Sequence, residues 1–160
     1  MPRFRVLVLT LCTLLSCLAV IAAISGCDTI RNEWYKQPLQ RVLLENSFIG
    51  DIPARARATA MHKVNLSGCP GDFISAYNQY IHAWEEVASA EDESIRLQGQ
   101  TGAVIGASIE AWLSNSAQTP LKDHSDAMSQ ASSHVNDAHT DVAKARQSFE
   151  DVTRKYGLQP

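Results

Sequence analysis

An apolar stripe near the C-terminal end is the longest regular pattern in this 160-residue chain. Apolar residues that recur every three or four positions predict a helix with one face packed against another helix. Thr119 and Pro120 fit the start of that helix and Gly157 fits its end, so we expect it to run from about 121 to 156, roughly 50 Å. Its apolar members recur in alternating steps of three and four residues: Met128, Ala131, Val135, Ala138, Val142, Ala145, Phe149, Val152 and Tyr156.

Two kinds of partner suit this predicted helix. Alanine is frequent in one of the two seam positions, so a neighbouring helix can approach closely. We expect that neighbour to come from the same chain, within an antiparallel bundle. A helix from another chain is the alternative.

Shorter helices are expected upstream of the stripe. Pro38 fits the first turn of one helix, and Gly50 and Pro53 break the chain after it. A second helix is predicted over 54–64, with its apolar residues on related faces. The sequence thus predicts two short helices in this part of the chain.

The next predicted helix begins at Pro70 and carries an aromatic-rich apolar face. Glycines at 99, 102 and 106 predict a loop after it, followed by a modest helix over 103–113 that packs closely through small residues. We expect Trp84→Ala to cost about 3–5 kcal/mol of stability. The members of the apolar face are Phe73, Ala76, Tyr77, Tyr80, Ile81, Trp84, Val87 and Ala88.

These patterns together predict an all-α fold. We expect an antiparallel helical bundle of about four helices with a long C-terminal helix, following an N-terminal signal or anchor segment. The expected organisation is a signal segment over 1–26, a tether over 27–37 and one helical domain over 38–160.

The N-terminal residues have the order of a secretory signal. Arg3 and Arg5 provide a positive start, and residues 6–24 contain no charge. Small residues, Ser25 and Gly26, then precede Cys27. A run of this length is also near that of a membrane-spanning helix, so an uncleaved anchor is the alternative.

Ile24-Ser25-Gly26-Cys27 resembles the lipobox of bacterial lipoproteins. The resemblance implies cleavage before Cys27 and attachment of diacylglycerol and fatty acyl chains such as palmitate to that residue. Two or more chains hold a protein stably on a membrane. The mature part would then face the periplasm or the exterior of a cell membrane. Leu14 to Cys17 forms a poorer version of the same motif.

Asp28 follows the expected lipidation site. An aspartate there resembles the inner-membrane retention signal of enteric lipoproteins, which favours the inner over the outer membrane.

The charge balance argues against a nucleic-acid partner. The chain has 14 basic and 17 acidic residues, and both Arg3 and Arg5 lie in the expected signal segment. The part after residue 26 is therefore acidic, and phosphate backbones require clustered basic side chains. We expect the membrane, through the lipid anchor, and an unknown protein as partners.

A second resemblance concerns the mature part. Cys69-Pro70-x-Asp72-Phe73, followed by Ala76-Tyr77, Ile81-His82 and Ala83-Trp84, resembles a motif of short uncharacterised bacterial helical proteins. The C-terminal sequence Tyr156-Gly157-Leu158 is similar to the end of their last helix. The resemblance implies a shared helical domain and no activity.

No motif for catalysis or for a cofactor is recognisable, so we expect a non-enzymatic structural or protein-interaction role without a cofactor. His82 lies three residues before Glu85, but carboxylate-bridged metal bundles need a second such pair. His82 and Trp84 are the candidate interaction residues. A small-ligand sensor that uses the aromatic face, or a bundle that binds metal or haem, is the alternative. Cys69 is the one cysteine after Cys27 and has no intramolecular disulfide partner in the mature part.

Overall fold

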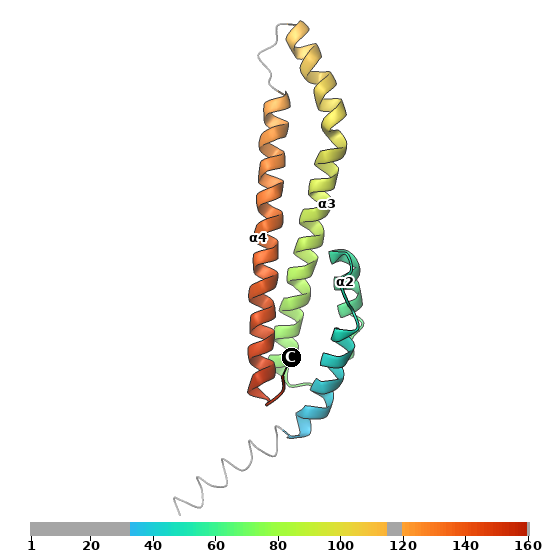
Figure 1. Cartoon of the computed structure of the whole chain (residues 1–160), viewed down its shortest axis with the longest axis vertical. Coiled ribbons are helices and arrows are strands. Elements are labelled where there is room, and N and C mark those ends of the chain that lie inside the picture. The colour runs from blue at the N-terminus through green and yellow to red at the C-terminus, as the bar shows by residue number, and fades with distance from the viewer. Residues whose placement is uncertain (1–32, 115–119, 160) are drawn as a thin grey trace, which may run out of the picture.

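The computed structural model of the chain describes residues 33–114 and 120–159, and all the regular structure in these residues is helical. A helical segment covers 33–47, and α2 (Ala54–Met61), α3 (Gly71–Leu113) and α4 (Pro120–Lys155) follow it. Figure 1 shows α3 and α4 as a long antiparallel pair, with α2 and segment 33–47 against one end of it. The predicted all-α antiparallel bundle is therefore confirmed.

The molecule has two parts that differ in their packing. We call the four-helix end the base, and the two-helix extension the arm, which consists of residues 93–113 of α3 and 120–134 of α4. The continuous hydrophobic core lies in the base and ends at Ala90 on α3 and Ala138 on α4. Only Leu97 and Ala131 are buried apolar residues of the arm among those described.

Aromatic side chains fill the centre of the base. Phe149 of α4 packs against three rings of α3, with centroid distances of 5.1 Å to Phe73, 5.4 Å to Tyr77 and 6.0 Å to Tyr80. Phe73 and Tyr77 are fully buried, and the Tyr77 hydroxyl donates to Asn46 Oδ1 at 3.2 Å. Burial raises the pKa of Tyr77. The predicted aromatic face is therefore the core contact between α3 and α4.

The structure confirms the C-terminal helix and its stripe. Every residue of the predicted stripe is buried or half-buried. The helix ends at Lys155, and the chain turns away at Gly157, where φ is +74°, a conformation that glycine adopts without strain. The Leu158 amide donates to the Thr153 carbonyl, and the Gly157 amide donates to the Arg154 carbonyl, which is a Schellman end. Thr119, the predicted cap, lies outside the described residues.

The expected loop around the glycines is wrong, because α3 continues unbroken through Gly99, Gly102 and Gly106. The expected packing through small residues of 103–113 does not involve the glycines, because an added Cβ at any of the three would meet no described atom of another segment within 4 Å. An opposite stripe of α3 faces α4 instead and sustains the helix. Its members are Leu97, Thr101, Val104, Ser108 and Ala111, and Thr101 Oγ1 lies 3.2 Å from His124 Nε2 of α4.

The N-terminal boundary also differs from expectation. Residues 33–37 were expected in the tether, but they are helical, and Pro38 lies inside the helix rather than at its start. Pro38 packs against Gly68 instead, whose φ is +83° and whose added Cβ would lie 3.3 Å from Pro38 Cγ. Because proline has no N–H, the helix lacks one backbone hydrogen bond at Pro38. The ring of Pro38 packs against Gly68 at this position.

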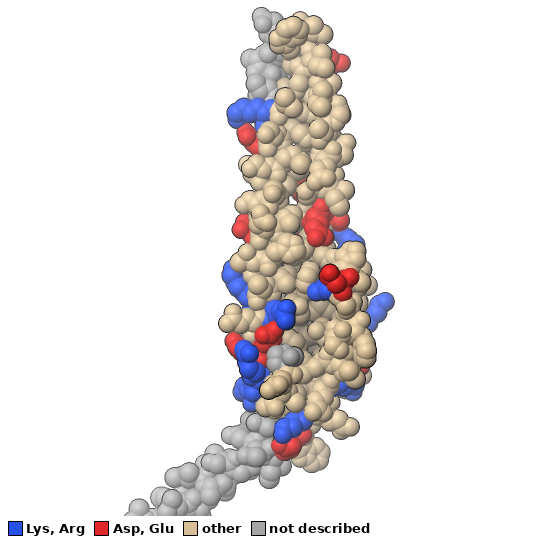
Figure 2. All heavy atoms as spheres, in the orientation of Figure 1, with Lys and Arg blue, Asp and Glu red and all other residues tan. Residues whose placement is uncertain are grey.

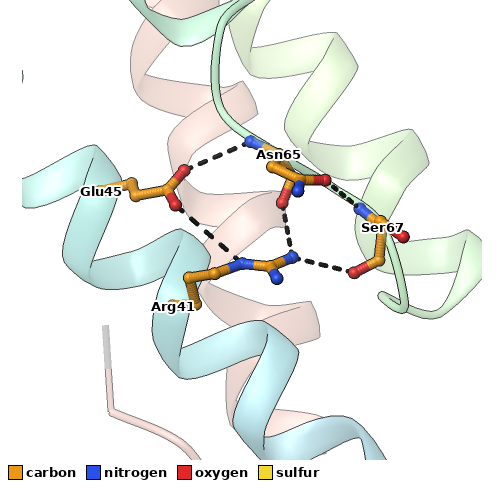
Figure 3. A network of polar contacts seen from close by, with 4 residues as sticks. All are labelled: Arg41, Glu45, Asn65 and Ser67. Carbon is orange, nitrogen blue, oxygen red and sulfur yellow. Dashed lines mark hydrogen bonds and ion pairs between the residues drawn. The ribbon is translucent and has the colours of Figure 1, made fainter.

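Polar contacts hold segment 33–47 to the connection between α2 and α3 (Figure 3). Arg41 Nη2 donates to the carbonyl oxygens of Asn65 and Ser67, both at 2.9 Å. Glu45 accepts from the Asn65 amide at 3.2 Å and lies 4.0 Å from Arg41 Nε. Because one guanidinium binds two carbonyls, the connection is held against the base.

Candidate functional site

The expected lipidation site lies outside the described residues. Ile24, Ser25, Gly26, Cys27 and Asp28 all precede residue 33, where the description begins. The signal, the lipid on Cys27 and the membrane location remain predictions. No helix among the described residues is both long and apolar enough to span a membrane.

His82 lies in a cluster that joins α2 to α3. His82 Nδ1 is 2.7 Å from Glu85 Oε2, and His62 Nε2 at the end of α2 is 2.8 Å from Glu85 Oε1. These two hydrogen bonds, that of His62 first, hold the pKa of Glu85 below its usual range. The spacing of His82 and Glu85 was visible in the sequence, whereas His62 comes from another helix.

This cluster lies on the surface, since the side chains of His82 and His62 are 73% and 54% exposed. Each histidine occupies a different oxygen of Glu85, so the carboxylate separates the two rings. The described residues contain no group of three His, Cys, Asp or Glu side chains that could hold a metal ion. The arrangement therefore serves as a polar contact between α2 and α3.

Trp84, the second candidate, is half-buried at the α2 side of α3. The Arg57 guanidinium of α2 lies 4.4 Å from the centre of its ring, and His139 of α4 meets the ring edge-on at 6.5 Å. Its Nε1 atom is buried without a hydrogen-bond partner among the described residues. Trp84 of α3 thus contacts both α2 and α4, which is a structural position.

Two other sequence candidates have structural roles. The aromatic face of α3, considered as a pocket wall, is occupied by Phe149. Cys69 is half-buried, and burial raises the pKa of its thiol, which opposes formation of the reactive thiolate.

The arm carries the largest group of exposed apolar side chains in the described structure. They are Ile95, Ile105, Ile109, Trp112, Leu113 and Leu121, with exposed fractions from 47% to 80%. Glu110 is the only charged residue between Arg96 and Lys122. Figure 2 shows the corresponding end of the visible face with few charged side chains. Large apolar side chains that are exposed together on one part of a molecule are typical of an interaction site.

The sequence contained this feature, but our prediction divided it. The seven-residue spacing from Ile95 through Gly102 to Ile109 is a heptad signal. Interpreting the glycines as a loop assigned these residues to different elements, so the continuous face was missed.

Comparison with known proteins identifies no relative. No protein-family model matches the chain, and no curated protein or solved structure matches it. The candidate site therefore rests on the residues and their geometry.

Proposed function

We propose that this chain is a lipid-anchored protein of the bacterial cell envelope whose arm binds other protein. It is cut before Cys27, acylated there, and held on the outer face of a membrane, with the inner membrane favoured by Asp28. Its role is structural or one of protein interaction, without catalysis. The lipobox-like sequence from Ile24 to Cys27 supports the location.

The single observation that carries the interaction role is the exposed apolar face of the arm. A two-helix hairpin that only had to fold would place polar residues on its outer face. Here Ile105 and Ile109 are about half exposed and Trp112 is 80% exposed. Because water contact with these side chains is unfavourable, their burial by a partner is the role that we assign to the arm.

The placement of the two parts fits this proposal. Segment 33–47 lies at the base, and the arm projects from the opposite end (Figure 1). The 43 residues of α3 span about 65 Å. A lipid on Cys27 would therefore keep the base beside the bilayer and present the arm tens of ångströms away from it.

Mass analysis of the protein from its native host tests the anchor. We expect a mature chain that begins at an acylated Cys27 and fractionates with membranes. Cys27→Ala should leave the chain uncut and unacylated, whereas Cys17→Ala, the matched control, should leave processing unchanged. An intact N-terminus with an unmodified Cys27 would contradict the anchor.

Photocrosslinking in intact cells tests the arm. A photoreactive amino acid at Ile109 should give discrete protein adducts, while the same group at Ala107, exposed on another side of α3, should not. Equal labelling from the two positions, or labelling of lipid alone from Ile109, would show that the arm face is not a protein-binding surface.

A further inference from the structure

The first turn of segment 33–47 forms the end of the described molecule that lies farthest from the arm (Figure 1). Trp34 lies in this turn and is 78% exposed. A tryptophan with this exposure keeps most of a large apolar ring in water, which is unfavourable. The ring is therefore a candidate contact with another surface.

Packing on the inner side of this turn keeps Trp34 on the outside. The ring of the next residue, Tyr35, meets the ring of Tyr156 edge-on, with the centroids 5.9 Å apart. Tyr156 is buried at the end of α4, and its hydroxyl donates to Asp72. Leu39, one turn further along the segment, is fully buried. Because Tyr35 and Leu39 fix the side that faces the core, the Trp34 side chain points away from it.

The length of the preceding chain limits the distance between this turn and the expected lipidation site. Trp34 is seven residues after Cys27. Even a fully extended chain spans at most about 3.6 Å per residue, so the two residues lie within about 25 Å of each other. A diacylglycerol on Cys27 would hold that residue at the bilayer surface. The turn that carries Trp34 is then the first part of the described structure to meet the lipid headgroups.

We propose that Trp34 enters the interfacial region of the bilayer that holds the acylated Cys27, and that this second attachment points the arm away from the membrane. The inference rests on the proposed function, because it requires the lipid on Cys27. Tryptophan suits the interface because its ring is apolar, while its indole N–H donates to headgroups or water. A phospholipid surface can therefore bury the ring and satisfy its donor together.

The charges around this turn make neutral lipid a sufficient partner. Three basic side chains lie in the turn and at the adjoining end of α4, and each pairs with a carboxylate, so the pairs carry no net charge. The contact therefore depends on the indole ring rather than on a basic patch, which anionic lipid would require. The pairs are Lys36 with Glu33, Arg154 with Asp151, and Lys155 with Asp72.

Two other exposed aromatic residues should stay in water if the molecule stands upright. Phe48 follows the far end of the same segment, about 20 Å from Trp34 along the helix axis, and is 79% exposed. Trp112 lies near the end of the arm and is 80% exposed. Both match Trp34 in exposure and differ from it in distance from Cys27. They are therefore the controls for its position.

Bromine quenching of tryptophan fluorescence tests the contact in the acylated full chain. The protein is extracted from host membranes and placed in phosphatidylcholine vesicles whose acyl chains carry bromine close to the headgroups. We expect quenching that Trp34→Phe largely removes and Trp112→Phe leaves unchanged, while half-buried Trp84 is present in both variants. Circular dichroism of the two variants should match that of the parent.

Three fluorescence results would overturn the inference. Quenching that persists in Trp34→Phe would show that the Trp34 ring is not in the lipid. An equal loss of quenching in Trp34→Phe and Trp112→Phe would show that the molecule lies flat. Quenching that appears only when phosphatidylglycerol is added would show that basic side chains, and not the ring, hold this end.

Photocrosslinking in intact cells tests the same position. A photoreactive amino acid at Trp34 should label phospholipid, while the same group at Phe48 should not. Lipid adducts from both positions, or protein adducts alone from Trp34, would overturn the inference.

Mass analysis of the same preparation separates this inference from the proposed function. An acylated Cys27 together with an unquenched Trp34 overturns the second attachment and leaves the lipid anchor intact. An unmodified Cys27 contradicts the anchor itself, and this inference falls with it.

Discussion

At the scale of single residues, Asp72 joins the first turn of α3 to the C-terminal end of α4. Its carboxylate accepts from Lys155 Nζ at 2.6 Å, from the Tyr156 hydroxyl at 2.7 Å and from the Phe73 amide at 2.9 Å. Partial burial raises the pKa of Asp72, but the hydrogen bonds of Lys155 and Tyr156 outweigh burial, so the pKa lies below its usual range. The start of α3 and the end of α4 are thus fastened by one ionised side chain.

This fastening predicts a pH dependence. A lowered folded-state pKa stabilises the fold above the unfolded value, about 3.9, and this stability is lost as pH falls through the folded value. Asp72→Asn should lower the free energy of unfolding by about 0.5–1 kcal/mol at pH 7, since the pair is partly exposed. Urea unfolding at pH 7 and pH 3 measures the difference.

The control for Asp72 is Asp141, which pairs with Lys144 on the exposed side of α4. Asp141→Asn should change stability by no more than about 0.3 kcal/mol. If the gap between Asp72→Asn and the parent were as large at pH 3 as at pH 7, the ionised carboxylate would not be its source.

Trp84 gives a second prediction at this scale. Because the side chain is half-buried, we lower the expected cost of Trp84→Ala to about 2–3 kcal/mol, below that of a fully buried tryptophan. Trp112→Ala, at 80% exposure, should cost no more than about 0.5 kcal/mol at concentrations that keep the chain monomeric. Urea unfolding compares them, and equal costs would contradict the packing of Trp84 against Arg57.

At the scale of elements, α3 shows how partners override local preference. Each interior glycine costs about 1 kcal/mol relative to alanine, so the sequence around Gly99, Gly102 and Gly106 favours a break. The facing stripe of α4 supplies the contacts that keep α3 helical. Local propensity therefore predicted a break within α3 that the structure does not have. The periodic stripe, by contrast, predicted the bounds of α4 to within a residue at each end.

The contrast between local sequence patterns and contacts of distant residues also explains which other features could be predicted. The seam of α4, its Gly157 end and the aromatic face of α3 depend on short spacings, which the sequence displays directly. The contact of Pro38 with Gly68 and that of His62 with Glu85 join residues that are far apart in the chain. Such pairings depend on the fold, so neither was predicted.

The glycines of the arm predict a local change in stability. Gly99→Ala should stabilise the arm by about 1 kcal/mol, because the new Cβ meets open space and reduces the freedom of the unfolded chain. Amide exchange across 95–113 of the monomer should slow about fivefold. Gly157→Ala, at positive φ, should instead destabilise the end of α4. Unchanged exchange in Gly99→Ala would contradict an open helical site.

At the scale of the whole molecule, the base and the arm should differ in stability. The base has four helices around a continuous core, while the arm has two helices and few buried side chains. We expect amides of 73–90 to exchange near the global unfolding rate and those of 104–113 to exchange at least about tenfold faster in the monomer. Uniform protection along α3 would contradict this division.

The facing stripes of α3 and α4 have a consequence for how such a molecule can change during evolution. Their contacts repeat every seven residues, so removal of one heptad from each helix would keep the remaining side chains in step. The projecting end would retreat by about 10 Å, and every contact among the four helices would survive. The length of the arm can thus change by whole heptads without any change in the base, which makes the protein stable.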